Sequence, residues 1–208
     1  MYDDKETTIA ELKEYIGIIC NERWWNHFHN PKDLSRRIYE EAVEILECFK
    51  DPCGSDKLPN EIADITFNVL RYFQKYGVDL ASTLHGITDE SITGTDNETN
   101  IAQLKSSVAQ SCGNDYWFRD QYYAARAIIE ESEMFVNYFS TMSESESETP
   151  FLKREISVYL ADIFAKILGL ADRSGINLPE AFYSKMEKNK KKYSADKSRG
   201  TALKYTML

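Results

Sequence analysis

The chain has 208 residues, of which 42% are hydrophobic and 28% charged, and its net charge is -9. This length and balance suit a globular protein with one large domain or two small ones. The negative charge argues against non-specific binding to a nucleic-acid polymer, and no apolar run reaches the ~18 residues that cross a membrane. Nine glycines and five prolines are few, which favours helices over a turn-rich β architecture.

Cysteine usage and the first residues indicate a compartment. The four cysteines form neither a CxxC pair nor a regular framework, which predicts free thiols in a reducing cytoplasm. They are Cys20, Cys48, Cys53 and Cys112. The first residues, MYDDKETT, are acidic and polar, unlike a secretory signal peptide. We therefore predict a cytoplasmic protein.

Apolar residues recur at helical spacing in three stretches of the first half. These predict a helix from Thr7 or Thr8 to about residue 25, a second over 33–49 with Asp33 as its N-cap, and a third over 59–76. Gly77 is expected to end the third helix as a C-cap. A short fourth helix is expected from Leu80.

The second half repeats this alternation of helices and breaks. The stretch ITGTDNET at 92–99 is expected to be a linker. Helices are then predicted from Asn100 onward, over 117–139, over 151–175 and over 179–192. The acidic, low-complexity stretch 140–150 separates two of them.

Two landmarks recur in both halves. IYEEAVEI aligns with AIIEESEM, and KYGVDLAST aligns with RSGINLPEA. The residues so paired are Glu41 with Glu130, Glu44 with Glu133, and Gly77 with Gly175. We therefore predict an all-α antiparallel helical bundle made of two fused repeats, 1–92 and 99–208.

Four acids recur at a spacing of three on neighbouring predicted helices. Glu41 and Glu44 share one helix face, and Glu61 and Asp64 share one face of the next. If the two helices are antiparallel neighbours, these faces meet and the carboxylates repel one another. The acids then either point to solvent, pair with Lys or Arg, or hold a hard divalent cation such as Mg²⁺. E-x-x-E alone is common on exposed helices; its recurrence as E-x-x-D raises the metal above background, and all three alternatives stay open.

Three longer stretches carry a resemblance. They are ERWWNHFHNPKDLSRRIYEEAVEIL, NEIADITFNVLRYFQKYGVDL and GINLPEAFYSKMEKNKKKYSADKSRGTALKYT. Together they resemble the all-α nucleoside triphosphate pyrophosphohydrolases, the MazG-like enzymes, and among these the dCTP pyrophosphatases. The matching positions outside the four acids include Trp25, Phe28, His29, Pro31, Lys32, Lys185, Met186, Asn189, Tyr193, Arg199, Gly200 and Lys204.

The resemblance implies a hydrolase that cleaves an NTP or dNTP between the α and β phosphates, with a house-cleaning role in the nucleotide pool. It implies Mg²⁺, or Mn²⁺ as a substitute, held by Glu41, Glu44, Glu61 and Asp64. Glu41 or Glu44 is the expected catalytic residue that orients the attacking water. The expected substrate-binding residues are Trp25, His29, Lys32, Asn68, Lys185, Asn189, Lys192, Tyr193, Arg199 and Lys204.

Departures from the family pattern limit what can be carried over. The first repeat lacks K-M-x-x-N, and in the second Tyr159 stands where Glu61 aligns. This division predicts one working site per chain. Asp51, Ile16 and Asn68 replace an aromatic residue, a histidine and a tyrosine of dCTP pyrophosphatases, so cytosine specificity is not carried over.

Three alternatives stay open. His29 precedes Pro31 and is equally suited to packing at the start of a helix, while Trp24 and Trp117 are expected in the core. The chain is alternatively a non-catalytic nucleotide-binding or dimerisation bundle. An exposed apolar edge on such a bundle would also be compatible with a homodimer.

Overall fold

A computed structural model describes residues 2–51, 53–88, 94–143 and 149–192. These residues form helices and no strand, which confirms the all-α prediction. The α-helices are α1 (Ile9–Glu22), α2 (Pro31–Cys48), α3 (Gly54–Tyr76), α4 (Leu80–His85), α5 (Ile101–Cys112), α6 (Gln121–Phe139), α7 (Pro150–Arg173) and α8 (Leu178–Lys192). Two 3₁₀ helices, Trp25–His27 and Tyr116–Phe118, precede α2 and α6.

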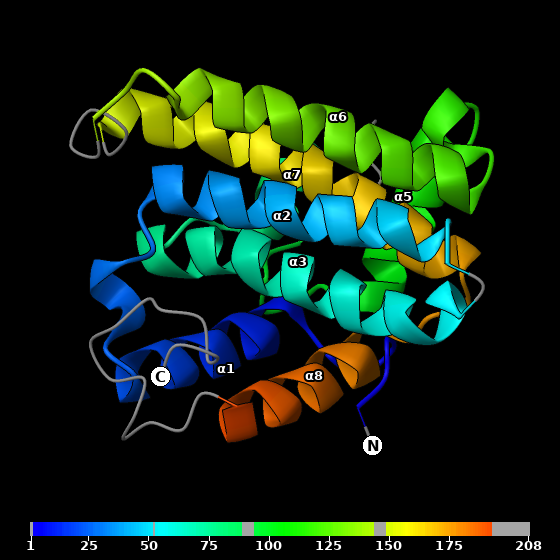
Figure 1. Cartoon of the computed structure of the whole chain (residues 1–208), viewed down its shortest axis with the longest axis horizontal. Helices are drawn as coiled ribbons and strands as arrows, with labels where there is room; N and C mark the ends of the chain where they lie inside the picture. Colours follow the sequence, from blue (N-terminus) through cyan, green and yellow to red (C-terminus); the bar gives the residue numbers. More distant parts are fainter. Residues whose placement is uncertain (1, 52, 89–93, 144–148, 193–208) are drawn as a thin grey trace.

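Four long helices form the centre of the bundle. α2 packs against α3 and α6, and α7 packs against α3 and α6. α1 and α8 cover the other side of α3, and α4 and α5 pack on α7. Figure 1 shows α6 and α7 on one side, α2 and α3 in the middle, and α1 and α8 opposite. The last helix of the chain therefore lies against a helix of the first half.

Local sequence explains where these helices begin and end. Thr8 and Asn100 each form a capping box, at the start of α1 and of α5. Asp120 caps α6 by accepting a hydrogen bond from the backbone N–H three residues later. Gly77 directly follows α3, and Gly175 lies one residue beyond Ser174, the C-cap of α7. The two glycines adopt left-handed φ angles of 64° and 62°, a conformation that favours glycine.

Several predicted boundaries were wrong. Asn30 caps α2 in place of Asp33. α3 begins at Gly54, five residues before the predicted start at Pro59. A β-carbon at position 54 would lie 1.7 Å from the Cys48 carbonyl oxygen, so glycine is what allows α3 to begin directly against the end of α2.

The predicted linker and the predicted helix over 117–139 also differ from the structure. Of the linker 92–99, residues 92 and 93 lie outside the described part of the chain, whereas Asp96 and Thr99 are buried. The segment from Gly94 onward is therefore packed into the fold. The predicted helix over 117–139 is divided in the structure into the 3₁₀ helix Tyr116–Phe118 and α6, because Asp120 caps a new helix.

One set of contacts occurs twice. Lys13 Nζ lies 2.5 Å from a carboxylate oxygen of Asp96 and 2.7 Å from the Val78 carbonyl. Lys105 Nζ lies 2.6 Å from Asp4 and 2.7 Å from the carbonyl of Ile176. Each lysine thus joins the segment before the first helix of the other half to the residue that follows the left-handed glycine of its own half. This recurrence supports the two proposed repeats, which remain a prediction together with their boundaries.

The repeats align differently from the predicted pairing on α2 and α6. Counted from the caps Asn30 and Asp120, Glu41 corresponds to Glu131, since both are eleven residues further on (41 − 30 and 131 − 120). Glu130 is exposed and pairs with Arg126 at 2.6 Å, and Glu133 is exposed. Counting from the caps thus differs by one residue from the predicted pairing of Glu41 with Glu130, which followed the similarity of the letters.

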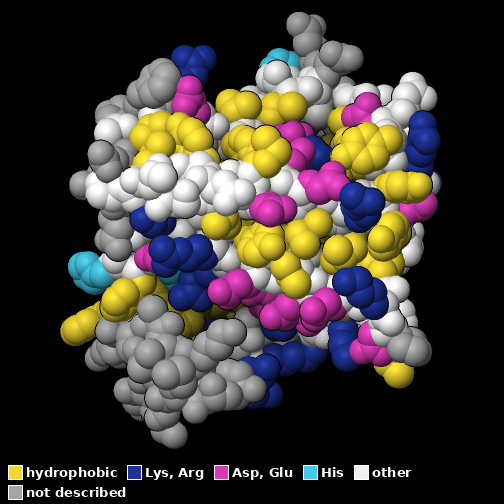
Figure 2. Space-filling view, turned by 45° about the horizontal axis from the view of Figure 1, so that its top comes forward, with side chains coloured by type: hydrophobic (Ala, Val, Ile, Leu, Met, Phe, Trp, Pro, Cys, Tyr) yellow, Lys and Arg dark blue, Asp and Glu magenta, His cyan; other side chains and the backbone are white. Residues whose placement is uncertain are grey.

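The surface carries charged and apolar side chains side by side. Figure 2 shows acidic and basic side chains interspersed with hydrophobic ones on one face. On α6, four large apolar side chains are exposed, namely Tyr122, Tyr123, Met134 and Tyr138. Such a face is compatible with the predicted homodimer, which stays a prediction. The four cysteines are free, and among the described helices none combines the length and apolarity that a bilayer crossing needs.

Candidate metal and nucleotide site

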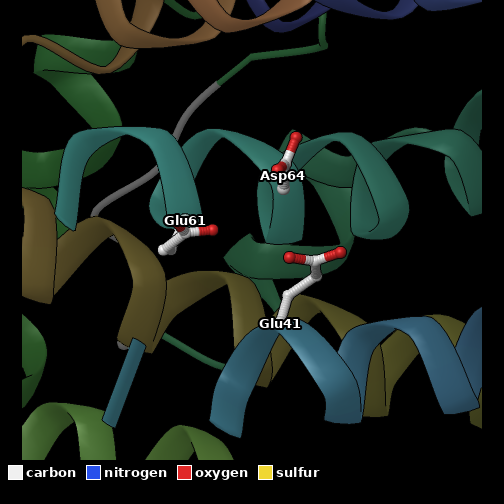
Figure 3. Close-up of side chains that lie close together, drawn as sticks. All are labelled: Glu41, Glu61 and Asp64. Carbon is white, nitrogen blue, oxygen red and sulfur yellow. The ribbon is translucent and has the colours of Figure 1, made fainter. Parts of the chain in front are cut away.

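Three of the four predicted acids meet between α2 and α3. Glu41, Glu61 and Asp64 each offer one carboxylate oxygen, and these oxygens lie within 4.8 Å of one another. Figure 3 shows Glu41 reaching from α2 toward α3, which carries the other two. Their spacing places Glu61 and Asp64 on one face of α3, and the packing of α2 on α3 brings Glu41 to that face.

Glu44 lies at the edge of this cluster. Its side chain is exposed, and it is not part of the three-oxygen group. A hydrogen bond with Glu44 nevertheless contributes to the raised pKa of Glu61. The fourth acid therefore lies next to the group, on its solvent side.

Burial and mutual repulsion raise the pKa values of the two glutamates in this group. Burial, followed by repulsion from Asp64, Glu44 and Glu61, raises the pKa of Glu41 to about 8. Burial also raises the pKa of Glu61 to about 7, against the attraction of Lys185. Glu61 Oε2 is buried and has no hydrogen-bond partner among the described residues. The site thus favours either bound protons or a cation.

A single basic side chain from α8 reaches the cluster. Lys185 Nζ lies 2.6 Å from Asp64 Oδ2, and both side chains are largely buried. Asn189, one turn further along α8, donates from Nδ2 to Asp64 Oδ1 at 3.0 Å. Burial alone would lower the pKa of Lys185, but its hydrogen bond with Asp64 and the attraction of the acids raise it. One lysine balances one of the three acids, so the basic side chains of the described residues do not neutralise the group.

Comparison with curated proteins finds relatives of this chain. Mouse (Mus musculus) dCTP pyrophosphatase 1 is 33% identical over 119 residues, which are 53% of this chain and 69% of the relative. The rat (Rattus norvegicus) protein of the same name is 31% identical over the same shares. The chain belongs to the dCTP pyrophosphatase family. The bovine (Bos taurus) dCTP pyrophosphatase 1 is 27% identical over 138 residues, covering 60% of this chain and 80% of the relative. No family model and no solved structure matches the chain.

His29, one of the predicted substrate contacts, is buried. It is 4% exposed, and it lies between Cys20, whose Sγ is 3.9 Å from Nδ1, and the ring of Phe67. Arg71 Nε donates to His29 Nδ1 at 3.3 Å. Burial, together with repulsion from Arg37, Arg71 and Lys75, lowers the pKa of His29 to about 2. This placement fits the packing alternative and a neutral ring.

The other predicted contacts are dispersed. Asn68 is buried and donates to the Asp64 backbone carbonyl, whereas Lys32 Nζ donates to the Met142 carbonyl at 2.6 Å. Trp25 is half-buried, with its ring centroid 5.8 Å from that of His29. Lys192 is exposed at the end of α8. Three predicted contacts, Tyr193, Arg199 and Lys204, lie outside the described residues.

The two tryptophans expected in the core have different environments. Trp117 is 5% exposed, as predicted, and a lysine ammonium lies 5.1 Å from its ring centroid. Trp24 is 55% exposed and has a φ angle of 56°, so its placement in the core was wrong. The left-handed backbone at Trp24 turns the chain between α1 and the following 3₁₀ helix, and this directs the side chain outward.

Proposed function

We propose that this protein is a nucleoside triphosphate pyrophosphohydrolase that converts a (d)NTP to a (d)NMP and pyrophosphate, with a house-cleaning role in the nucleotide pool. The observation that carries the proposal is the group of three inward carboxylates with a lysine from α8 beside it. The relatives named dCTP pyrophosphatase 1 support the class of reaction.

The donor set fits a hard divalent cation. Three carboxylate oxygens from two helices are ligands that Mg²⁺ and Mn²⁺ prefer, and Glu61 Oε2 is buried without a hydrogen-bond partner among the described residues. Glu41, Glu61 and Asp64 would hold the ion, with Glu44 at the solvent side. When bound, Mg²⁺ supplies charge neutralisation at the phosphates and lowers the pKa of water.

The chain's own side chains have separate tasks in this proposal. Glu44 is exposed beside Glu61, where a carboxylate can orient water for attack on the α phosphorus. Glu41 is the alternative for this role, because its carboxylate belongs to the same group of acids and reaches it from α2. Lys185 and Asn189 fix the Asp64 carboxylate, and their remaining hydrogen-bond donors are the proposed contacts for a phosphate.

The remaining assignments extend the site along the chain. Lys192, Tyr193, Arg199 and Lys204 are proposed phosphate or sugar contacts that follow Asn189. Trp25, His29, Lys32 and Asn68 complete the proposed set, and the buried position of His29 favours an indirect role for it. Because α8 belongs to the second proposed repeat and packs on α3 of the first, both repeats contribute to one site.

The proposal is tested by incubating the full chain with Mg²⁺ and a panel of NTPs and dNTPs. Release of pyrophosphate and a nucleoside monophosphate in equal amounts is expected for at least one of them. Release of inorganic phosphate with a diphosphate would refute cleavage between the α and β phosphates. If nucleotides bind in Mg²⁺ but none is hydrolysed, the non-catalytic binding alternative is correct. The same panel identifies the preferred base and sugar.

A further inference from the structure

A second group of charges, centred on a buried lysine, lies in the other half of the bundle. Lys166 on α7 places Nζ 2.7 Å from Glu131 Oε1 on α6 and 2.9 Å from Asp162 Oδ1, one turn earlier on α7. The lysine side chain is 6% exposed, and its ammonium lies 5.1 Å from the ring centroid of Trp117. The ammonium is thus enclosed by two carboxylates and an aromatic ring.

This group occupies the place in its half that the candidate metal site occupies in the first. Glu131 corresponds to Glu41 when both are counted from their helix caps. Counted back from Gly77 and Gly175, Asp162 corresponds to Asp64, at thirteen residues (77 − 64 and 175 − 162), and Lys166 corresponds to Asn68, at nine (77 − 68 and 175 − 166). The helix pairs α2–α3 and α6–α7 are both in direct contact.

The remaining two acids of the first site have no counterpart. Met134, which corresponds to Glu44, is 62% exposed. Tyr159, which corresponds to Glu61, stacks on Phe135 with a centroid distance of 5.4 Å, and its hydroxyl donates to the Glu131 carbonyl. The second group therefore has two carboxylates and one ammonium. The first has three carboxylates, with Glu44 as a fourth at its edge, and is contacted by one lysine from α8.

We infer that Lys166 is a built-in cation that takes the place of the divalent metal in the second half, so that the chain binds one metal ion and has one catalytic centre. An ammonium with three donors can satisfy two carboxylates, and its covalent attachment keeps it there at any metal concentration. The inference rests on the proposed function only for the role of the first site. If this is correct, the charges of the second group stay balanced when no metal is present. Metal and product are then exchanged at the first group alone.

The number of metal ions is measured by titration with Mn²⁺, followed by electron paramagnetic resonance of the free ion. The wild-type chain is expected to bind one ion, Glu41→Gln none, and Glu131→Gln one with unchanged affinity and retained hydrolysis. If Glu41→Gln still binds one ion, and the further change Glu131→Gln abolishes this binding, the second group holds metal and the inference is overturned.

The role of Lys166 in stability is measured by thermal unfolding in EDTA. Lys166→Met leaves the largely buried Glu131 carboxylate and the half-exposed Asp162 carboxylate without their cation, so a fall in Tm on the order of 10 °C is expected. The matched control Arg126→Met breaks the exposed Arg126–Glu130 pair and should lower Tm by about 1 °C or less. Equal effects of the two variants would overturn the inference.

Two further outcomes keep the test decisive. If Lys166→Met does not fold, the double variant Glu131→Gln/Lys166→Met is expected to restore folding, because it also removes the more buried carboxylate. If the double variant fails to fold, loss of charge balance is not the cause and the inference is overturned. A wild-type chain that binds no Mn²⁺ and hydrolyses no nucleotide would refute the proposed function, while the comparison in EDTA would still decide whether Lys166 is a stabilising internal cation.

Discussion

Replacing Glu41 by glutamine removes the carboxyl group that burial and its acidic neighbours disfavour most in ionised form. The pKa of Glu41 is raised from 4.5 to about 8. Between these values the folded state binds more protons than the unfolded state, so the stability of the metal-free protein falls as pH rises across this window. At about 1.4 kcal/mol per pH unit, full ionisation of Glu41 costs the folded protein on the order of 5 kcal/mol.

Glu41→Gln should remove most of this cost. In EDTA at about pH 9, the variant is expected to be more stable than the wild type by about 2–5 kcal/mol, or on the order of 10 °C in Tm for a chain of this size. At about pH 5 the difference should nearly vanish, because the wild-type carboxyl is then protonated. Far-UV circular dichroism during heating measures both values.

The same substitution should abolish the stabilisation by metal and most of the hydrolytic activity. Excess Mg²⁺ is expected to raise the Tm of the wild type but not that of Glu41→Gln, and hydrolysis should fall by roughly two to three orders of magnitude. Glu40→Gln, which changes the adjacent exposed residue by the same charge, is the matched control and should retain both properties. A Glu41→Gln protein that is no more stable than the wild type at about pH 9 in EDTA would refute the electrostatic reasoning.

Three further predictions concern other parts of the site and fold. The rise in wild-type Tm caused by Mg²⁺ should be larger at about pH 9 than at about pH 6, because protons compete for the two glutamates with raised pKa values; equal rises would contradict this. Lys185→Met should lower the stability of the metal-free protein by about 3 kcal/mol at neutral pH, since Asp64 loses its largely buried partner, whereas exposed Lys188→Met should have little effect on denaturant unfolding. Gly54→Ala should destabilise by several kcal/mol through its clash with the end of α2, while Gly86→Ala, with its nearest atom 3.5 Å away, should be nearly neutral in Tm.

Periodic apolar residues and local caps were sufficient to predict most helices. The helical spacing and the glycines at 77 and 175 indicated α3 and α7, and the structure places both glycines in left-handed conformations. The start of α3 could not be found in this way, because it depends on the close approach of Gly54 to Cys48, a contact between two helices. Trp24 was misplaced for a similar reason, since a large apolar side chain carries no signal of the turn that exposes it.

The acid spacing predicted which side chains share a helix face, and the resemblance to the family indicated what they do. Neither the spacing nor the resemblance predicted that Glu44 would lie at the edge of the acid group, that Lys185 would bind Asp64 directly, or that His29 would be buried. These depend on how α2, α3 and α8 pack, and α8 is more than a hundred residues from α3 in the chain.

The sequence by itself determined the helical class, the two pairs of acids and the family, because each of these is encoded in residues a few positions apart. Only the tertiary structure decided which carboxylates converge and which cation faces each group. Lys185 reaches the first group from α8, which is distant in the chain. Lys166 of the second group lies on α7, one turn from Asp162. Electrostatic energy depends on separation in space and on burial, and neither quantity can be read from position along the chain.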